Sequence, residues 1–150
     1  MRQAVSTFDG CVEYVFKHHL LQQVTYDSVL RRWRRELHRA VAVWIRQRSG
    51  TRSAEFGPLI AGHLELAGDT RAAADAWQRA AADAMQRYAY ATAVAHAERA
   101  LALDDGSRPA WRYELMRVVE NALAPGKRRT RPARPPCGLA RRARSFGRRD

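Results

Sequence analysis

The sequence contains little of what secreted or membrane proteins display. Among 150 residues there are two cysteines, Cys11 and Cys137, which lie far apart and lack metal-ligand spacing. No uncharged apolar run approaches the roughly 20 residues that a membrane-spanning helix needs. The charges of Asp9, Glu13 and Lys17 near the start also disfavour a signal peptide. These absences predict a reduced, cytoplasmic protein.

Catalytic signatures are also missing. The P-loop pattern G-x-x-x-x-G-K-[ST] is absent, so no phosphate cradle of that type is encoded. Cys11 precedes a predicted strand and not a helix N-terminus of the kind that activates reactive cysteines. We expect Glu65 and Asp69 to be single carboxylates on exposed helix faces, without an acid–base partner. The serines lie in no nucleophile-elbow context: Ser6, Ser28, Ser49, Ser53 and Ser107. We therefore expect no catalytic residues and no enzyme activity from this chain.

Five histidines raise the possibility of a metal site. His18 and His19 are adjacent, so on a helix their side chains point in different directions and make a poor chelate. His38, His63 and His96 stand alone in the sequence, without a cysteine or carboxylate at ligand spacing. Packing or capping roles explain them better, with His18 as a structural residue where strand meets helix. We expect no metal-binding residues, no cofactor-binding residues and no cofactor.

Positive charge is abundant but unevenly distributed. The formal net charge is +12, and residues 125–150 carry ten of the Lys and Arg residues against one acidic residue, Asp150. That segment is rich in proline and arginine, has almost no apolar residues and shows no periodicity. We predict a disordered basic C-terminal tail over 125–150, because too little apolar surface is available to offset the entropy of ordering. The rest of the chain is only mildly basic.

The first part of the chain predicts a short β-ribbon followed by helix. Residues 1–24 suggest a hairpin that turns at Asp9-Gly10, with 12–17 as its better strand, and then a short helix over 18–24. A turn is expected at 24–26. From Asp27 onward, apolar residues recur at three- and four-residue steps, and we expect this stripe to be the buried spine on which later helices stack. Its members are Leu30, Trp33, Leu37, Val41, Trp44 and Ile45.

Alanine-rich helical patterns follow over 54–67, 70–88, 91–103 and 108–122, and Gly50 and Gly68 are expected as left-handed caps. Pro58 is tolerable only in a first turn. Segments 73–80 and 93–100 resemble each other, which indicates stacked helical hairpins, although their offset is too short for regular tetratricopeptide repeats. The predicted inward residues are Leu59, Ile60, His63, Leu64, Ala67, Ala73, Ala74, Trp77, Ala80, Ala81, Ala84, Trp111, Leu115, Val118 and Ala122. We predict an all-α fold: a tetratricopeptide-like antiparallel array over 25–124, after the β-ribbon and short helix of 1–24.

One stretch also carries a family resemblance. The string VEYVFKHHLLQQVTYDSVLRRWRRELHRAVAVWI resembles the region after the ATPase module in bacterial adenylate/guanylate cyclase-like signal-transduction ATPases with numerous domains. The matching positions are Tyr14, Phe16-Lys17-His18, Tyr26, Ser28-Val29-Leu30 and Leu37-His38. Segments 60–69 and 111–115 resemble helical hairpins of the same family. The resemblance implies a winged-helix end followed by tetratricopeptide-like helices, with the cyclase and P-loop ATPase domains N-terminal to this region and absent from the chain.

These observations favour a non-catalytic regulatory or protein-interaction segment of a cyclase-type signalling ATPase, and we expect a piece of a larger protein. The partner would be a protein bound through the helical surface, with no membrane involved. The alternative is a nucleic-acid-binding module that uses the basic helix and the tail, since Arg31, Arg32, Arg34 and Arg35 surround Trp33. Binding through 125–150 would be non-specific. A truncated gene product without autonomous function is a third possibility.

Overall fold

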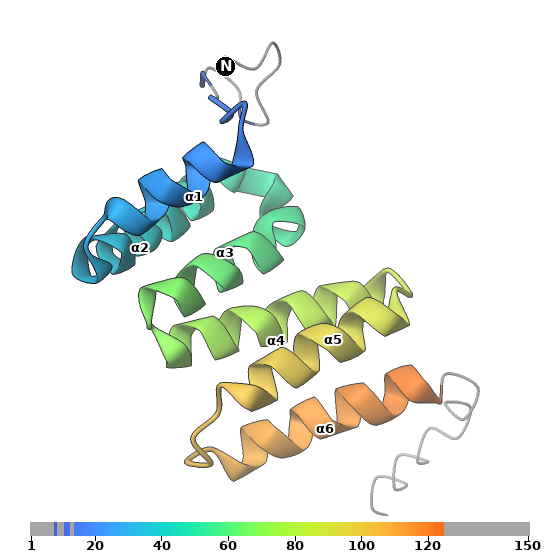
Figure 1. The fold of residues 1–150 in the computed structure, drawn as a ribbon. Coiled ribbons are helices and arrows are strands. Elements are labelled where there is room, and N and C mark those ends of the chain that lie inside the picture. Colours follow the sequence, from blue (N-terminus) through green and yellow to red (C-terminus); the bar gives the residue numbers. More distant parts are fainter. Residues whose placement is uncertain (1–7, 9–10, 13, 125–150) are drawn as a thin grey trace, which may run out of the picture.

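The described chain is a succession of stacked helices (Figure 1). The computed structural model describes residue 8 and the ranges 11–12 and 14–124. Its elements are α1 (His19–Ser28), α2 (Arg31–Ser49), the 3₁₀ turn η1 (Gly50–Arg52), α3 (Ser53–Ala67), α4 (Thr70–Gln86), α5 (Tyr90–Ala102) and α6 (Pro109–Leu123). The prediction of an all-α fold is confirmed for these residues. The predicted disordered tail lies outside them.

Each helix from α2 to α5 packs against the next helix in the sequence, and α4 also touches α6. Consecutive helices reverse direction through short connections (Figure 1). Gly68 closes α3 in the left-handed region with φ of +82°, and its N–H donates to Glu65 O at 2.9 Å. The N–H of Asp69 donates to Leu64 O at 3.0 Å, which completes a glycine-terminated helix end. The left-handed cap predicted at Gly68 is therefore confirmed.

Alanine fills most of the core. One cluster joins α2, α3 and α4, and consists of Ala42, Ile45, Phe56, Ile60, Ala61, Leu64, Ala73 and Ala76. A second joins α4, α5 and α6, and consists of Ala81, Ala97, Ala100 and Leu115. Trp77 packs against both clusters. Small side chains let helix axes approach closely, so the repeated alanines predicted for α4 are found where the helices touch. Of the residues predicted to point inward, Leu59 is exposed instead.

Two boundaries differ from the prediction. Residues 24–26, expected to form a turn, lie inside α1, which ends at Ser28. The Ser28 hydroxyl donates to Thr25 O at 2.7 Å, and Val29 and Leu30 take extended conformations that separate the two helices. Pro58, expected in a first turn, is the sixth residue of α3. The helix tolerates it because α3 begins at Ser53, so only one internal hydrogen bond is lost.

The β-ribbon stays a prediction. The whole of its first strand, 3–7, lies outside the described residues. In its second strand, the described residues 12 and 14–17 form no strand. α1 continues across residue 24, where the first segment was expected to end. Phe8 is the described part of this lead-in that reaches the core: its ring lies 4.8 Å from both Trp44 and Phe56, measured between centroids.

The spine predicted for α2 is confirmed at Ile45, which is buried, and is wrong at its other five members, which are exposed. The side chains that α2 buries are Ala42, Ile45 and Ser49, whereas Trp33 is 50% exposed and Leu37 is 57% exposed. Val41 and Trp44 are also exposed. Small residues on the neighbouring face of α2 allow closer packing on the alanine-rich helices than tryptophan does. The apolar stripe therefore lies beside the helix interface and faces outward.

Candidate interaction surface

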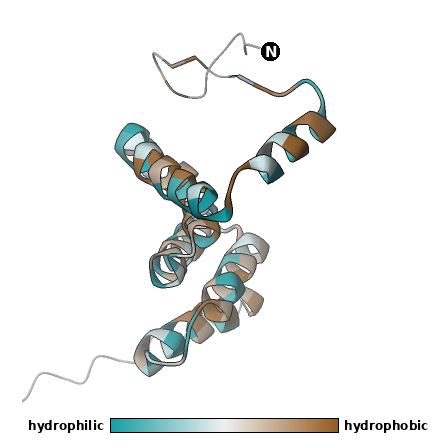
Figure 2. Cartoon of the chain, turned by 60° about the vertical axis from the view of Figure 1, so that its left-hand side comes forward, coloured by the Kyte–Doolittle hydropathy of each residue, from teal (hydrophilic) through white to brown (hydrophobic). Residues whose placement is uncertain are grey.

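Large apolar side chains are exposed on α1 and along α2, and we call this set the α1–α2 apolar face. Its members are Leu20, Leu21, Val24, Leu30, Trp33, Leu37, Val41 and Trp44. Figure 2 shows α1 standing apart from the helices that follow it, with hydrophobic residues along it and at its junction with α2. Single exposed apolar residues are ordinary, but eight large ones gathered on two consecutive helices indicate a candidate interaction site.

A chain of three polar side chains connects α1 to the array. The Tyr26 hydroxyl lies 2.9 Å from Nε2 of His38, and Nδ1 of His38 lies 2.9 Å from Nδ1 of His63. Burial lowers the pKa of His38, and the Arg34 guanidinium lowers it further. Burial also lowers the pKa of His63, with a smaller effect from His38. Neutral rings suit this arrangement, because one Nδ1 must donate and the other accept.

Sequence reasoning treated His38 and His63 as isolated, and that interpretation is wrong. His38 precedes Gly50 by twelve residues and His63 follows it by thirteen. Residues equidistant from the turn of an antiparallel helical hairpin lie at similar heights, because both helices rise equally per residue. This symmetry about Gly50 was the feature of the sequence that could have predicted the contact between His38 and His63. His96, the third histidine, lies with its ring centroid 5.0 Å from that of Trp77. His18 and His19 are exposed.

α2 carries seven arginines and one glutamate. Two of these arginines pair with carboxylates: Arg39 makes a two-pronged contact with Asp69 at 2.6 and 2.7 Å, and Arg34 reaches Asp27 at 3.3 Å. The Arg39 contact lowers the pKa of Asp69 through its hydrogen bonds. Arg31, Arg32, Arg35 and Arg46 make no ion pair with any described residue. An excess of positive charge therefore borders the α1–α2 apolar face.

The carboxylates of α3, α4 and the α5–α6 turn also form cross-helix contacts. Glu65 on α3 accepts hydrogen bonds from Trp77 on α4 and from Arg99 on α5. Arg108 donates to Asp75 on α4 at 2.6 Å, and its guanidinium lies 4.0 Å from the Trp111 ring centroid. The interpretation of Glu65 and Asp69 as single members of exposed faces is therefore wrong. In each case the partner is an arginine on another helix.

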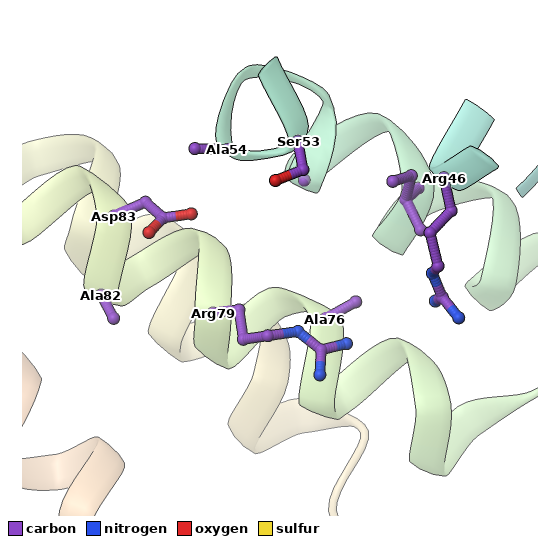
Figure 3. Close-up of a pocket in the computed structure, with 9 residues that line it drawn as sticks. Arg46, Ser53, Ala54, Ala76, Arg79, Ala82 and Asp83 are labelled. Atoms are coloured by element: carbon purple, nitrogen blue, oxygen red, sulfur yellow. The ribbon is translucent and has the colours of Figure 1, made fainter. Parts of the chain in front are cut away.

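A pocket of about 540 Å³ lies between the end of α2, the start of α3 and the middle of α4 (Figure 3). We call it the α2–α4 pocket. Arg46, Arg79, Ser53 and Asp83 supply its polar groups, and the remaining lining residues are Ala54, Gly57, Ile60, Ala76 and Ala82. The guanidinium groups of Arg46 and Arg79 have no hydrogen-bond or ion-pair partner among the described residues.

The remaining candidates for chemistry in the described part of the chain are metal-ligating and nucleophilic side chains. No group of three or more histidine, cysteine, aspartate or glutamate residues is placed there to hold a metal ion. Cys11 is half-buried and unpaired by any disulfide. Ser49 is buried with its hydroxyl donating to Arg46 O at 3.1 Å. None of the described helices has the length and hydropathy that crossing a membrane requires.

Comparisons with known proteins give no family for this chain. No protein-family model matches it, no curated protein shows significant sequence similarity to it, and no solved structure matches its fold at a significant level.

Proposed function

We propose that the chain is a non-catalytic regulatory and protein-interaction segment, built as tetratricopeptide-like hairpins and belonging to a cyclase-type signalling ATPase. The α1–α2 apolar face is its docking surface. The observation that carries the proposal is the exposure of Trp33 and Leu37 on the helix whose His38 and Ala42 face α3. Large apolar groups that the array itself does not cover stabilise a complex when a partner buries them.

The chemistry of the partner follows from the charge around this face. Arg31, Arg32 and Arg35 lie on the same helix as Trp33 and Leu37, with Glu36 as the single acidic residue of α2. A partner helix with an apolar stripe and acidic flanks complements both features. A second copy of this chain fits less well, because two such faces would bring arginines together. The proposed partner is therefore an acid-flanked amphipathic helix.

The test uses a designed helical peptide about three heptads long, with leucine at positions a and d and glutamate at e and g. We expect saturable binding to the wild-type chain by fluorescence anisotropy, and at least tenfold weaker binding by Trp33→Ala/Leu37→Ala. Leu66→Ala is the matched control, because Leu66 is equally exposed but lies on α3 outside the face. Equal affinity of all three proteins would contradict the proposal.

The second candidate is polyanion binding at the start of α2. Sequence reasoning discounted it because Trp33 was expected to be buried, but Trp33 is half exposed and the Arg32 guanidinium lies 5.4 Å from its ring centroid. Charge beside an exposed aromatic ring suits a nucleic-acid backbone and an unstacked base. Arg31→Gln/Arg32→Gln should then weaken duplex DNA binding and reduce its salt dependence. A chain lacking residues 125–150 separates this site from the tail.

A further inference from the structure

We infer that the α2–α4 pocket binds a carboxylate of a peptide through the guanidinium groups of Arg46 and Arg79. This site is separate from the α1–α2 apolar face and deepens the proposed interaction function by naming a second ligand class. The two sites are tested with different variants, so failure of one leaves the other standing.

The pattern of ion pairs in the array supports the inference. Arg39, Arg99 and Arg108 each contact a carboxylate from another part of the array: Asp69 just before α4, Glu65 on α3 and Asp75 on α4. Arg46 on α2 and Arg79 on α4 also lie on helices that face one pocket, yet neither contacts a carboxylate among the described residues. An external carboxylate would supply here what the protein's own carboxylates supply at the other three positions.

Figure 3 shows how the polar groups are arranged around the pocket. The side chains of Arg46 and Arg79 approach one end from α2 and α4, while Ser53 and Asp83 lie at the other end. Arg79 and Asp83 are one helical turn apart on α4, or about 6 Å along its axis. A bound peptide could place a carboxylate between the arginines while a backbone N–H donates to Asp83. The pocket thus offers donors at one end and acceptors at the other.

The remaining lining residues select the kind of anion. Ala54, Gly57, Ile60 and Ala76 make the floor apolar, which suits the methylene groups beside a carboxylate. Asp83 in the same pocket disfavours a doubly charged phosphate, because like charges repel at short range in a partly desolvated site. The basic segment 125–150, with ten Lys and Arg residues and one aspartate, also has the wrong sign to occupy it. A peptide carboxylate is the best match.

The experiment titrates alanine-based peptides into the isotope-labelled full chain and follows the Nε–H resonances of Arg46 and Arg79 by NMR. One peptide has a central glutamate and blocked ends, a second has glutamine there, and a third has no acidic side chain but a free C-terminal carboxylate. We expect both arginine resonances to shift with one or both carboxylate peptides, and at least tenfold weaker binding of the glutamine peptide. The tighter of the carboxylate peptides identifies whether the source is a side chain or a C-terminus.

Matched variants complete the test. Arg46→Gln and Arg79→Gln should each weaken binding of the carboxylate peptide at least tenfold, whereas Arg71→Gln removes the same charge from α4 outside the pocket and should leave binding within twofold. Circular dichroism establishes that each variant keeps its helical content. The inference is overturned if no peptide binds, if glutamate and glutamine peptides bind equally, if Arg71→Gln weakens binding as much as Arg79→Gln, or if inorganic phosphate binds more tightly than the carboxylates.

Discussion

The two ends of the helical array differ in which apolar side chains they bury and which they expose. In α3 to α6, alanines such as Ala73, Ala81 and Ala97 are fully buried where helices touch. On α1 and α2, the larger side chains of Leu20, Trp33 and others are exposed, and α2 packs on α3 through Ala42 and Ile45. Small side chains suit contacts between helices of the same chain, because they allow the two backbones to approach closely. Large exposed ones leave contact area for another molecule.

The largest expected effect compares one substitution at both ends. Leu115→Ala empties a fully buried position in the cluster that joins α4, α5 and α6, and should lower the free energy of unfolding by about 2–5 kcal/mol. Leu37→Ala removes the same atoms from an exposed position and should change it by about 0.5 kcal/mol or less. Urea denaturation of both variants measures the difference. Similar losses would show that the α1–α2 apolar face is covered within the chain.

The next effect tests whether the alanine interface is closed to larger groups. Ala73→Leu forces three extra heavy atoms into a site with no exposed surface and should destabilise the fold by about 1–3 kcal/mol. Ala72→Leu is the control, because Ala72 is the preceding residue of α4 and is exposed. Thermal unfolding monitored by circular dichroism compares the two. A stabilising Ala73→Leu would mean that helices α3 and α4 have room to separate.

The smallest effect concerns the link between α1 and the array. Because the folded protein lowers the pKa of His38 and His63, the unfolded chain binds more protons just below the ordinary histidine value of about 6.5. Stability should therefore be complete above that pH and decline as the pH falls through it toward the lowered values. The lowered pKa of His96, caused by burial and then by Arg87, acts in the same direction.

Variants separate the contribution of the histidine pair from that of His96. His38→Gln should flatten the decline in melting temperature between about pH 7.5 and about pH 5.5, and His63→Gln should flatten it by a similar amount. The double variant should flatten the decline more than either single one, because burial lowers the pKa of each ring separately. If the melting temperature of His38→Gln declined with falling pH as much as that of the wild-type chain, His38 would not be a cause of the decline.

Local rules in the sequence were enough for the end of α3 and for the alanine core. Gly68 predicted a left-handed cap, and the spacing of Ala73, Ala80 and Ala84 placed them inward, because both depend on residues close in sequence. The orientation of α2 was not predictable in the same way. An apolar stripe shows that a face avoids water, but it does not show whether the same chain covers it.

The contacts of the candidate sites required knowledge of how helices pair. His38 with His63, Arg39 with Asp69 and Arg99 with Glu65 join residues 25 to 34 positions apart. Their meeting depends on helix lengths on both sides of each turn, and an error of one residue rotates a side chain by about 100°. The α2–α4 pocket was equally hidden, because it is enclosed by three helices whose spacing no local pattern specifies.

Trp77 has a consequence for how the array unfolds. Stacked helical hairpins contact only their neighbours, so their unfolding can break into separate steps when the coupling between units is weak. Trp77 packs against both core clusters and also donates to Glu65 across the α3–α4 contact. A single side chain shared by two units opposes independent melting of either one. Its indole fluorescence would then report loss of the whole array in one cooperative transition, and Trp77→Phe would weaken the coupling at that junction.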